Sequence, residues 1–321
     1  MRRKILFRAD ADKIIGFGHF VRTLALADML KDDFDCTFYT QTPTDYQKAE
    51  VAKVCKLVEL PSDDSKFDLF LSLLRGEEIV FLDNYFNTSE YERQVRNKGC
   101  KLVVISTNDK HHYADVLINM GNDDLSKFDV EHYTRICKGL EWTILRPVFL
   151  TKRQSGDRIN GSFVISFGGT DQYGLLEVVV NVLRKLYPQS QLHIIATSLI
   201  SRKRILGLEE KGCIAHIDVS ASEIASLFDI CENAILSTST IAIEALSREI
   251  NVYAGYYVDN QYKLFSFLHD NRYIYGLGNL LDKTMPEHLE SLLLNHAVLQ
   301  GVNSNMLFAT KEKYLTLFKG L

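Results

Sequence analysis

A histidine at the start of a predicted helix is the strongest candidate for a chemical role in this sequence. The residues around it are Asp10 at the end of the preceding strand, then Gly16, Gly18, His19 and Arg22. Glycines let the backbone approach a ligand closely, and free N–H groups at a helix N-terminus attract anions. Histidine suits a general base because its ordinary pKa is about 6.5. The pattern fits a catalytic His19, and it fits a residue that only caps or packs the helix start equally well.

A second polar group, Asp83-Asn84-Tyr85, follows another predicted strand. A carboxylate and a phenol at the carboxyl end of a strand can orient a base or contact a sugar hydroxyl. The alternative is a helix N-cap by Asp83 beside a packed tyrosine. The residues alone leave open whether Asp10 or Tyr85 orients the imidazole or the water. The adjacent pair His111-His112 predicts no metal site, because neighbouring side chains on a polar loop usually point apart.

Two loops in the second half of the chain have the composition of a phosphate-binding site. One is a Gly-Gly turn without a Walker lysine, for which a simple tight turn is the alternative. The other leads from a strand into a helix and combines hydroxyls with helix-start N–H groups, which can hold a diphosphate. A glutamate one turn into that helix can accept both ribose hydroxyls, although a solvated glutamate is the default. The candidates for binding a nucleotide diphosphate are Gly168, Gly169, Thr170, Asp171, Ser237, Ser239, Thr240, Glu244, Asn260 and Gln261.

The elements that must position these residues alternate between short β-branched strands and longer helical patterns. That alternation is typical of parallel sheets covered by helices, so the predicted class is α/β. A polar stretch over residues 151–160 predicts a boundary between domains 1–152 and 153–321. Ligands of such sheets bind beyond the carboxyl ends of the strands, which places the candidate loops at a cleft between the domains. A last amphipathic helix over residues 306–318 could dock back on the first domain.

Composition excludes several other classes of protein. The chain has 321 residues, a net charge of -4 and 6 scattered cysteines. The charge gives no support for nucleic-acid or stable membrane binding, and the cysteine spacing indicates neither a zinc site nor a disulfide framework. No apolar run approaches the ~20 residues that span a bilayer, so a cytoplasmic protein is predicted. No metal or other cofactor is expected.

The ordered motifs, taken together, resemble those of the UDP-sugar hydrolases of pseudaminic acid biosynthesis. The motifs are Phe7-Arg8-Ala9-Asp10, Gly16-Phe17-Gly18-His19 with Arg22, Leu82-Asp83-Asn84-Tyr85, residues 114–119, Leu145-Arg146 with Phe149, residues 168–171, residues 237–244 and Asn260-Gln261. Members of this family cleave UDP-2,4-diacetamido-2,4,6-trideoxy-β-L-altropyranose. The family is similar to GT-B glycosyltransferases, particularly the one that forms lipid II. The resemblance implies two Rossmann-like domains whose parallel sheets face a central cleft, with UDP held mainly by the second.

The resemblance also implies roles for single residues. His19 matches the histidine that activates water for attack on the anomeric carbon, with cleavage of the C1–O bond. Tyr85 matches the tyrosine of the family's Ile-Asp-His-Tyr motif. Asp10, from its place beside this loop, is the further catalytic candidate, and the substrate-binding residues expected in the first domain are Gly16, Gly18, Arg22 and Asn119. The chain departs from the family at Asn84, where histidine is usual, and over residues 106–109, where paired aspartates are common. These departures concern the sugar more than the fold.

The sequence therefore predicts a nucleotide-sugar hydrolase that releases UDP, with UDP as part of the substrate and as product. Two other hypotheses about the function stay open. A GT-B glycosyltransferase needs the same nucleotide pocket and an acceptor in place of water. A catalytically silent protein would bind the UDP-sugar without cleaving it. The sugar's configuration, the stereochemistry of the product and the oligomeric state are not predicted.

Overall fold

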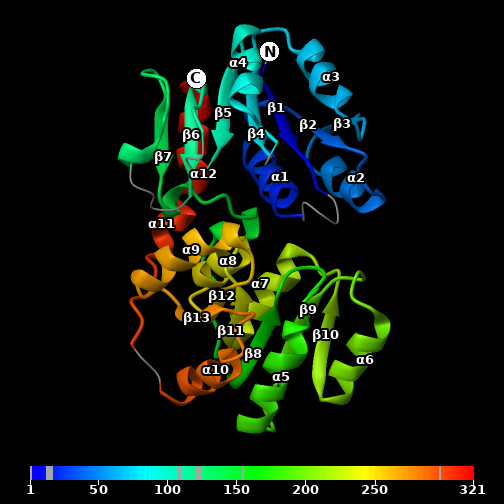
Figure 1. The fold of residues 1–321 in the computed structure, drawn as a ribbon, viewed down its shortest axis with the longest axis vertical. Coiled ribbons are helices and arrows are strands. Elements are labelled where there is room, and N and C mark those ends of the chain that lie inside the picture. Colours follow the sequence, from blue (N-terminus) through cyan, green and yellow to red (C-terminus); the bar gives the residue numbers. More distant parts are fainter. Residues whose placement is uncertain are drawn as a thin grey trace. The chain divides into compact units, whose positions relative to one another are not determined.

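The computed structural model describes residues 2–11, 17–84, 86–106, 110–120, 125–153, 155–295 and 298–321. The chain divides into two compact units (Figure 1). Unit 1 comprises Met1–Leu150 and Met306–Leu321, and unit 2 comprises Thr151–Asn305. The predicted boundary, after residue 152, lies two residues later, and the predicted second domain included the last residues of the chain. In the structure the chain returns, and its C-terminal helix belongs to unit 1.

Unit 1 is built on a seven-stranded sheet whose strands all pair in parallel. The strands are β1 (Lys4–Ala9), β2 (Asp35–Gln41), β3 (Lys56–Leu60), β4 (Ile79–Asp83), β5 (Lys101–Ile105), β6 (Val116–Asn119) and β7 (Arg135–Lys138). Their order across the sheet is β3-β2-β1-β4-β5-β6-β7. The order therefore reverses between β1 and β4, which are hydrogen-bonded neighbours although two strands separate them in the chain.

Helices cover both faces of this sheet because alternate strand residues point to opposite faces and nearly all are apolar. Phe7 of β1 packs with Phe20 of α1 and Tyr314 of α12 on one face. Leu6 packs with Phe70 of α3 on the other. The helices of unit 1 are α1 (Gly18–Leu30), α2 (Asp45–Ala52), α3 (Ser65–Leu73), α4 (Ser89–Asn97) and α12 (Thr310–Lys319), with short 3-10 turns at Leu125–Lys127, Leu140–Trp142 and Pro147–Leu150.

The return of α12 to unit 1 rests on aromatic packing. Tyr314 is fully buried, and its hydroxyl donates to the Trp142 carbonyl at 2.6 Å. The Trp142 and Tyr314 rings meet edge to face with centroids 5.5 Å apart. Phe318, also fully buried, meets Phe34 in the same way. Burial of two aromatic side chains explains why this last segment adds to the first core.

Unit 2 repeats the plan with a six-stranded parallel sheet. Its strands are β8 (Ile159–Ser166), β9 (Leu192–Ala196), β10 (Cys213–Ile217), β11 (Cys231–Ser237), β12 (Asn251–Tyr256) and β13 (Tyr275–Asn279), in the order β10-β9-β8-β11-β12-β13. Its helices are α5 (Leu175–Leu186), α6 (Arg202–Glu210), α7 (Ala221–Ile230), α8 (Thr240–Ser247), α9 (Asp259–Asp270) and α10 (Met285–Leu294), and α11 (Ser304–Phe308) leads back to unit 1. Here the strand order reverses between β8 and β11.

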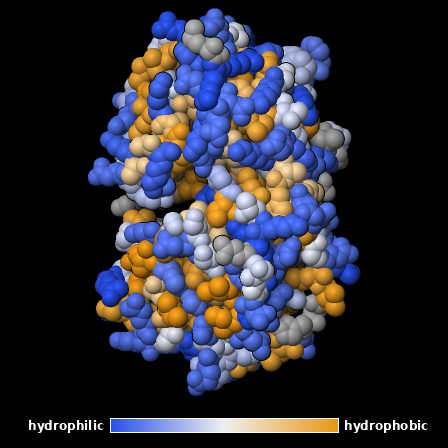
Figure 2. All heavy atoms as spheres, turned by 180° about the vertical axis from the view of Figure 1, so that it is seen from behind, coloured by the Kyte–Doolittle hydropathy of each residue, from blue (hydrophilic) through white to orange (hydrophobic). Residues whose placement is uncertain are grey.

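The surface agrees with the composition. Figure 2 shows polar and apolar residues interspersed over the face that it presents. Within the described ranges, no helix is both long enough and apolar enough to cross a membrane. All six cysteines are free thiols, and only Cys55 among them is not buried.

Candidate functional site

The reversal of strand order between β1 and β4 marks the first candidate site. In an open parallel sheet, the helices on either side of such a reversal leave a crevice beyond the carboxyl ends of the strands, where ligands bind. Ala9 and Asp83, the last residues of β1 and β4, are register partners, so the two strands end side by side. We call the residues around these two strand ends the unit 1 edge.

His19 and Asp83 form the centre of the unit 1 edge. His19 lies in the first turn of α1, and its Nδ1 lies 2.6 Å from Oδ1 of Asp83. His19 is 6% exposed and Asp83 is 1% exposed. An ionised carboxylate only accepts hydrogen bonds, so its 2.6 Å contact favours a proton on Nδ1 and the lone pair on Nε2, while Nη2 of Arg22, which only donates, also lies 3.0 Å from Nδ1. This tautomer is the one that a general base acting through Nε2 requires.

Two residues of α1 hold the Asp83 carboxylate. Arg22 donates to both oxygens, from Nε to Oδ2 and from Nη2 to Oδ1, each at 2.5 Å. The hydroxyl of Thr23 donates to Oδ2 at 3.1 Å. Burial favours the neutral acid, but the charges and hydrogen bonds of Arg22 and His19 outweigh it and hold the pKa of Asp83 well below its usual value. Asp83 is therefore a fixed negative charge, largely balanced by Arg22.

Asp10 is turned toward a different set of partners. Its carboxylate receives two hydrogen bonds from the Arg8 guanidinium, and the Gln41 backbone N–H donates to it at 2.8 Å. Asp10 is fully buried, and its own N–H donates to the Asn84 side chain at 3.0 Å. The sequence left open whether Asp10 or Tyr85 orients the imidazole. The structure brings Asp83 to His19 instead, and Asp10 joins the ends of β1 and β2.

Other predicted residues of unit 1 are less informative. Gly16, Tyr85 and residues 107–109 lie outside the described ranges. Gly18 has open space beside its Cα, since a Cβ built there would meet nothing within 4 Å. The side-chain amide of Asn119, at the end of β6, donates to the Ser106 carbonyl at 3.0 Å, so this residue links two neighbouring strand ends.

The histidine pair is engaged in two separate contacts. Nδ1 of His111 lies 2.8 Å from the Asp129 carboxylate, whereas His112 is fully buried with Nδ1 3.0 Å from Glu92. Hydrogen bonding by Asp129 raises the pKa of His111. Nowhere in the described part of the chain do three or more potential metal ligands gather.

The second candidate site lies at the reversal between β8 and β11, which we call the unit 2 edge. Gly168 has φ +79°, a left-handed conformation that favours glycine, and a Cβ there would lie 3.0 Å from the Tyr257 hydroxyl. That hydroxyl donates to the Phe167 carbonyl at 3.2 Å. Thr197 donates to the Gly169 carbonyl at 2.5 Å. Both glycines are exposed, so the turn offers its backbone to solvent.

Asp171 has a structural place in this loop. Its carboxylate accepts from the backbone N–H of Leu175 at 2.9 Å and of Leu176 at 3.3 Å, which caps the start of α5. Arg204 also donates to this carboxylate and to the Asp171 carbonyl. Burial nevertheless raises the pKa of Asp171. Thr170, just before it, is exposed.

The loop after β11 is anchored by Thr238. Its N–H and its hydroxyl both donate to the Gly255 carbonyl, at 2.7 and 2.8 Å. Ser239 is the N-cap of α8 and makes no side-chain capping bond, and the first turn of α8 holds no acidic residue. The partial positive charge of this helix start is thus left for an anion. Thr240 is half-buried, and Ser237 and Glu244 are each 2% exposed.

The last predicted pair begins α9. Asn260 is exposed in the first turn. The Gln261 side-chain carbonyl accepts from the Tyr257 backbone N–H at 3.1 Å, which fixes the backbone just before α9. Gln261 therefore lies beside Tyr257, the residue whose ring contacts the glycine turn.

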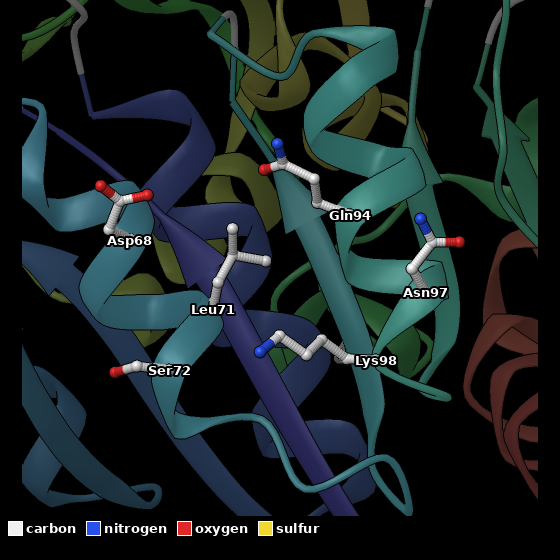
Figure 3. A pocket seen from close by; sticks show the side chains of 6 residues that line it. All are labelled: Asp68, Leu71, Ser72, Gln94, Asn97 and Lys98. Atoms are coloured by element: carbon white, nitrogen blue, oxygen red, sulfur yellow. The ribbon is translucent and has the colours of Figure 1, made fainter.

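A separate pocket of about 600 Å³ lies between α3 and α4, and Figure 3 shows the side chains that border it. They are Asp68, Leu71, Ser72, Gln94, Asn97 and Lys98. These residues come from covering helices and from the residue that ends α4, and not from the carboxyl ends of strands. The lining of the pocket contains no histidine and none of the residues predicted to bind a nucleotide.

Comparison with known proteins gives a relative in sequence and several in fold. No protein-family model matches the chain. The UDP-2,4-diacetamido-2,4,6-trideoxy-β-L-altropyranose hydrolase of Campylobacter jejuni is 26% identical over 268 residues, which cover 80% of this chain and 93% of that protein. The sequence resemblance is thus confirmed at modest identity.

Two solved structures have the same architecture. MurG of Acinetobacter baumannii matches with a TM-score of 0.62 at 10% identity, covering 99% of this chain and 100% of that one. Anabaena Alr3699/HepE, solved with UDP-glucose, matches with a TM-score of 0.61 at 10% identity and the same coverage. These likenesses confirm the predicted fold class, a GT-B type fold of two Rossmann-like units with parallel sheets.

Proposed function

We propose that the protein is a UDP-sugar hydrolase that releases UDP from a UDP-linked diacetamido-trideoxyhexose, in biosynthesis of pseudaminic acid-type sugars. The observation that carries the proposal is the buried contact of His19 with Asp83 and Arg22 at the unit 1 edge. A histidine held in one tautomer by a carboxylate is suited to take a proton from water. The sequence similarity to a UDP-sugar hydrolase supports the same assignment.

The chemical step needs one base. Water attacks the anomeric carbon, its oxygen forms the new bond to C1, and the C1–O bond to UDP breaks. His19 Nε2 takes the proton of the attacking water, and UDP leaves with the electron pair of the broken bond. Asp83 stays ionised and stabilises the imidazolium through Nδ1–H. The proton then returns to solvent. A diphosphate is a good leaving group, so the step requires no strong acid.

The unit 2 edge is assigned to UDP. Backbone N–H groups of the exposed Gly168-Gly169 turn and of the α8 start supply neutral donors to the diphosphate. The hydroxyls of Ser237 and Ser239 add to them. Glu244 accepts the two ribose hydroxyls. Asp171 keeps the turn in place through α5, and a direct contact with the ligand is not part of its role.

A glycosyltransferase is the second candidate, because the fold is that of MurG and HepE. It would use the same UDP edge and a base to deprotonate an acceptor hydroxyl in place of water. A protein that binds a UDP-sugar without cleaving it is the third possibility. The three differ in what the protein does to a UDP-sugar in water alone.

The test is to incubate the protein with a panel of UDP-sugars, with and without candidate acceptors, and to measure UDP release by mass spectrometry. We expect release in water alone, with ¹⁸O from labelled water in the sugar and not in UDP, because the C1–O bond breaks. We expect the same rate in a chelator, since hydroxyls and helix-start amides suffice for the diphosphate. Release only with an acceptor would establish the transferase, and label in UDP would contradict cleavage at C1.

A further inference from the structure

Lys66 is buried beside the end of β2, and among the described residues no carboxylate lies within ion-pair distance of its ammonium. It lies in the first turn of α3 and is 7% exposed. Its ammonium donates to the Gln41 side-chain carbonyl at 2.9 Å and to the Ser62 backbone carbonyl at 3.4 Å. Within the described ranges these are its hydrogen-bond acceptors, and no carboxylate pairs with it. An ammonium has three donors, so one N–H of Lys66 has no acceptor.

The charges around Lys66 are otherwise balanced. Arg8 pairs with Asp10, and Arg22 pairs with Asp83. In the described part of the chain Lys66 has no such close pair, and the carboxylate that feels its charge is that of the exposed Asp63, whose pKa is lowered by local hydrogen bonds and further by Lys66. Burial of an ammonium that is not fully hydrogen-bonded is costly in proteins, so its retention calls for an explanation.

An exposed aromatic ring lies beside the ammonium. The Lys66 Nζ is 5.7 Å from the centre of the Phe86 ring and 5.2 Å from that of Phe67. These contacts stabilise the cation in the absence of an ion-paired carboxylate. Phe86 follows β4 in the chain and is 46% exposed, so its ring presents apolar surface next to the unused N–H.

The position of Lys66 relates it to His19. Its partner Gln41 ends β2, the Gln41 N–H donates to Asp10 after β1, and His19 contacts Asp83 at the end of β4. The strand ends β2, β1 and β4 are consecutive in the sheet. Neighbouring strands lie about 4.8 Å apart, so β2 and β4 end about 10 Å apart. That span suits a hexose ring together with one substituent arm.

We propose that Lys66 and Phe86 form a subsite for an acylamino substituent of the sugar. The acyl carbonyl accepts the third N–H of Lys66, and the acyl methyl group packs on the Phe86 ring. A hydroxyl would satisfy the N–H and leave the ring uncovered, whereas an acylamino group satisfies the N–H and covers the ring. This inference rests on the proposed function and assigns to it a specificity element in unit 1.

The experiment combines one residue change with one substrate change. The probes are UDP-2,4-diacetamido-2,4,6-trideoxy-β-L-altropyranose and its two analogues in which the C2 or the C4 acetamido group is replaced by hydroxyl. For the unmodified protein, we expect kcat/KM to be about 10- to 100-fold lower for one analogue, the usual effect of a hydrogen bond to a charged group. In Lys66→Met, kcat/KM for the diacetamido substrate should fall to within about 3-fold of the value for that analogue.

Controls separate this role from a purely structural one. Lys53→Met removes an exposed lysine of unit 1 and should leave all three rates unchanged. Phe86→Ala changes an exposed side chain that the fold does not require, and it should lower kcat/KM for the diacetamido substrate more than for the discriminated analogue. The same loss for all three UDP-sugars in Lys66→Met and in Phe86→Ala, or no loss, would overturn the subsite.

Failure of the proposed function has a different signature. If the unmodified protein releases no UDP from any probe, hydrolysis is wrong, and calorimetric binding of the same three UDP-sugars decides the subsite. Selective weakening of the diacetamido sugar by Lys66→Met would then support it. Equal affinity of the two proteins, or no binding at all, would refute it.

Discussion

The two sheet edges share a topology and differ in chemistry. At both, a parallel sheet reverses its strand order and two strands end side by side. The unit 1 edge is filled with charged groups in pairs, such as Arg22 with Asp83. The unit 2 edge carries a glycine turn, hydroxyls and a helix start, and among its described residues are two buried carboxylates, Glu244 and the Arg204-paired Asp171. The same fold thus presents one edge suited to move a proton and another suited to hold an anion.

Burial explains why the charged edge is the more constrained one. A buried charge must be paired or hydrogen-bonded, so Asp10 and Asp83 at the unit 1 edge are each fixed by an arginine. The neutral donors of the unit 2 edge are parts of the backbone and need no counter-ion. A general base must lie within hydrogen-bond distance of the water that it deprotonates, whereas a diphosphate can be bound by many weak donors. This comparison is the basis of the predictions below.

Replacement of His19 should have the largest effect. His19→Asn keeps a polar side chain and removes the titratable group, so we expect kcat to fall by about 10²–10⁴-fold with UDP affinity unchanged. His111→Asn is the matched control, since that histidine contacts Asp129 away from the edge. A normal rate in His19→Asn would contradict the proposed mechanism.

Replacement of Asp83 should have the next largest effect. In Asp83→Asn the side-chain amide can donate to Nδ1, which favours the tautomer that has its proton on Nε2. We expect kcat to fall by about 10²-fold, within the range for loss of acid–base catalysis, and UDP affinity to stay the same. A variant that loses UDP affinity together with its rate, or that no longer folds, would indicate that Asp83 only supports the fold.

The two edges also differ in how far the sequence predicts them. Residues in a loop after a strand could be assigned to the unit 1 edge or the unit 2 edge from the sequence, because the carboxyl ends of parallel strands lie on the same side of a sheet. The partner of His19 could not be chosen, since Asp10 and Asp83 both follow strands that flank the reversal. The pleat of the strands decides between the two aspartates. Ala9 and Asp83 are register partners, so their side chains point to the same face of the sheet, whereas the side chain of Asp10 points to the opposite face.

The burial of Lys66 and the outermost strands of both sheets were harder to predict from the sequence. A lysine in a polar run after Asp63 reads as solvated, and its burial arises from contacts with Gln41 and Phe86, distant in the chain. The four outermost strands, β3, β7, β10 and β13, were not predicted. The first three are half-exposed and mix polar with apolar residues, and β13 is short and contains two glycines. The central strands, buried on both faces, were predicted as continuous apolar runs.

Replacement of Glu244 tests the binding edge alone. Glu244→Ala would leave the ribose hydroxyls without their acceptor, so we expect UDP affinity to fall by about 1–3 kcal/mol in calorimetry. The rate at saturating substrate should change little, in contrast to His19→Asn. Glu209→Ala on α6 removes an exposed glutamate and serves as the control. Full affinity in a folded Glu244→Ala would remove this residue from the site.

The smallest expected effect concerns how the two units respond to pH. In unit 2, His193 and His216 lie on neighbouring strands with ring nitrogens 3.0 Å apart. Burial is the main cause that lowers the pKa of both, and His216 lowers the pKa of His193 further, while Glu223 acts in the opposite direction on His216. In the unfolded chain both residues titrate near pH 6.5.

As the pH falls through about 6.5, the unfolded chain therefore binds protons before folded unit 2 does, and the free energy of unfolding of unit 2 decreases. In unit 1, the raised pKa of His111 has the opposite sign, although that residue is partly exposed and its effect is small. Trp142, the single tryptophan, reports on unit 1 by fluorescence, and calorimetry reports on both units. Between about pH 8 and about pH 5.5, we expect the unit 2 transition to move to lower temperature and the Trp142 transition to move less. His216→Gln should reduce the unit 2 shift, and the same pH dependence with and without His216 would show that the pair does not cause it.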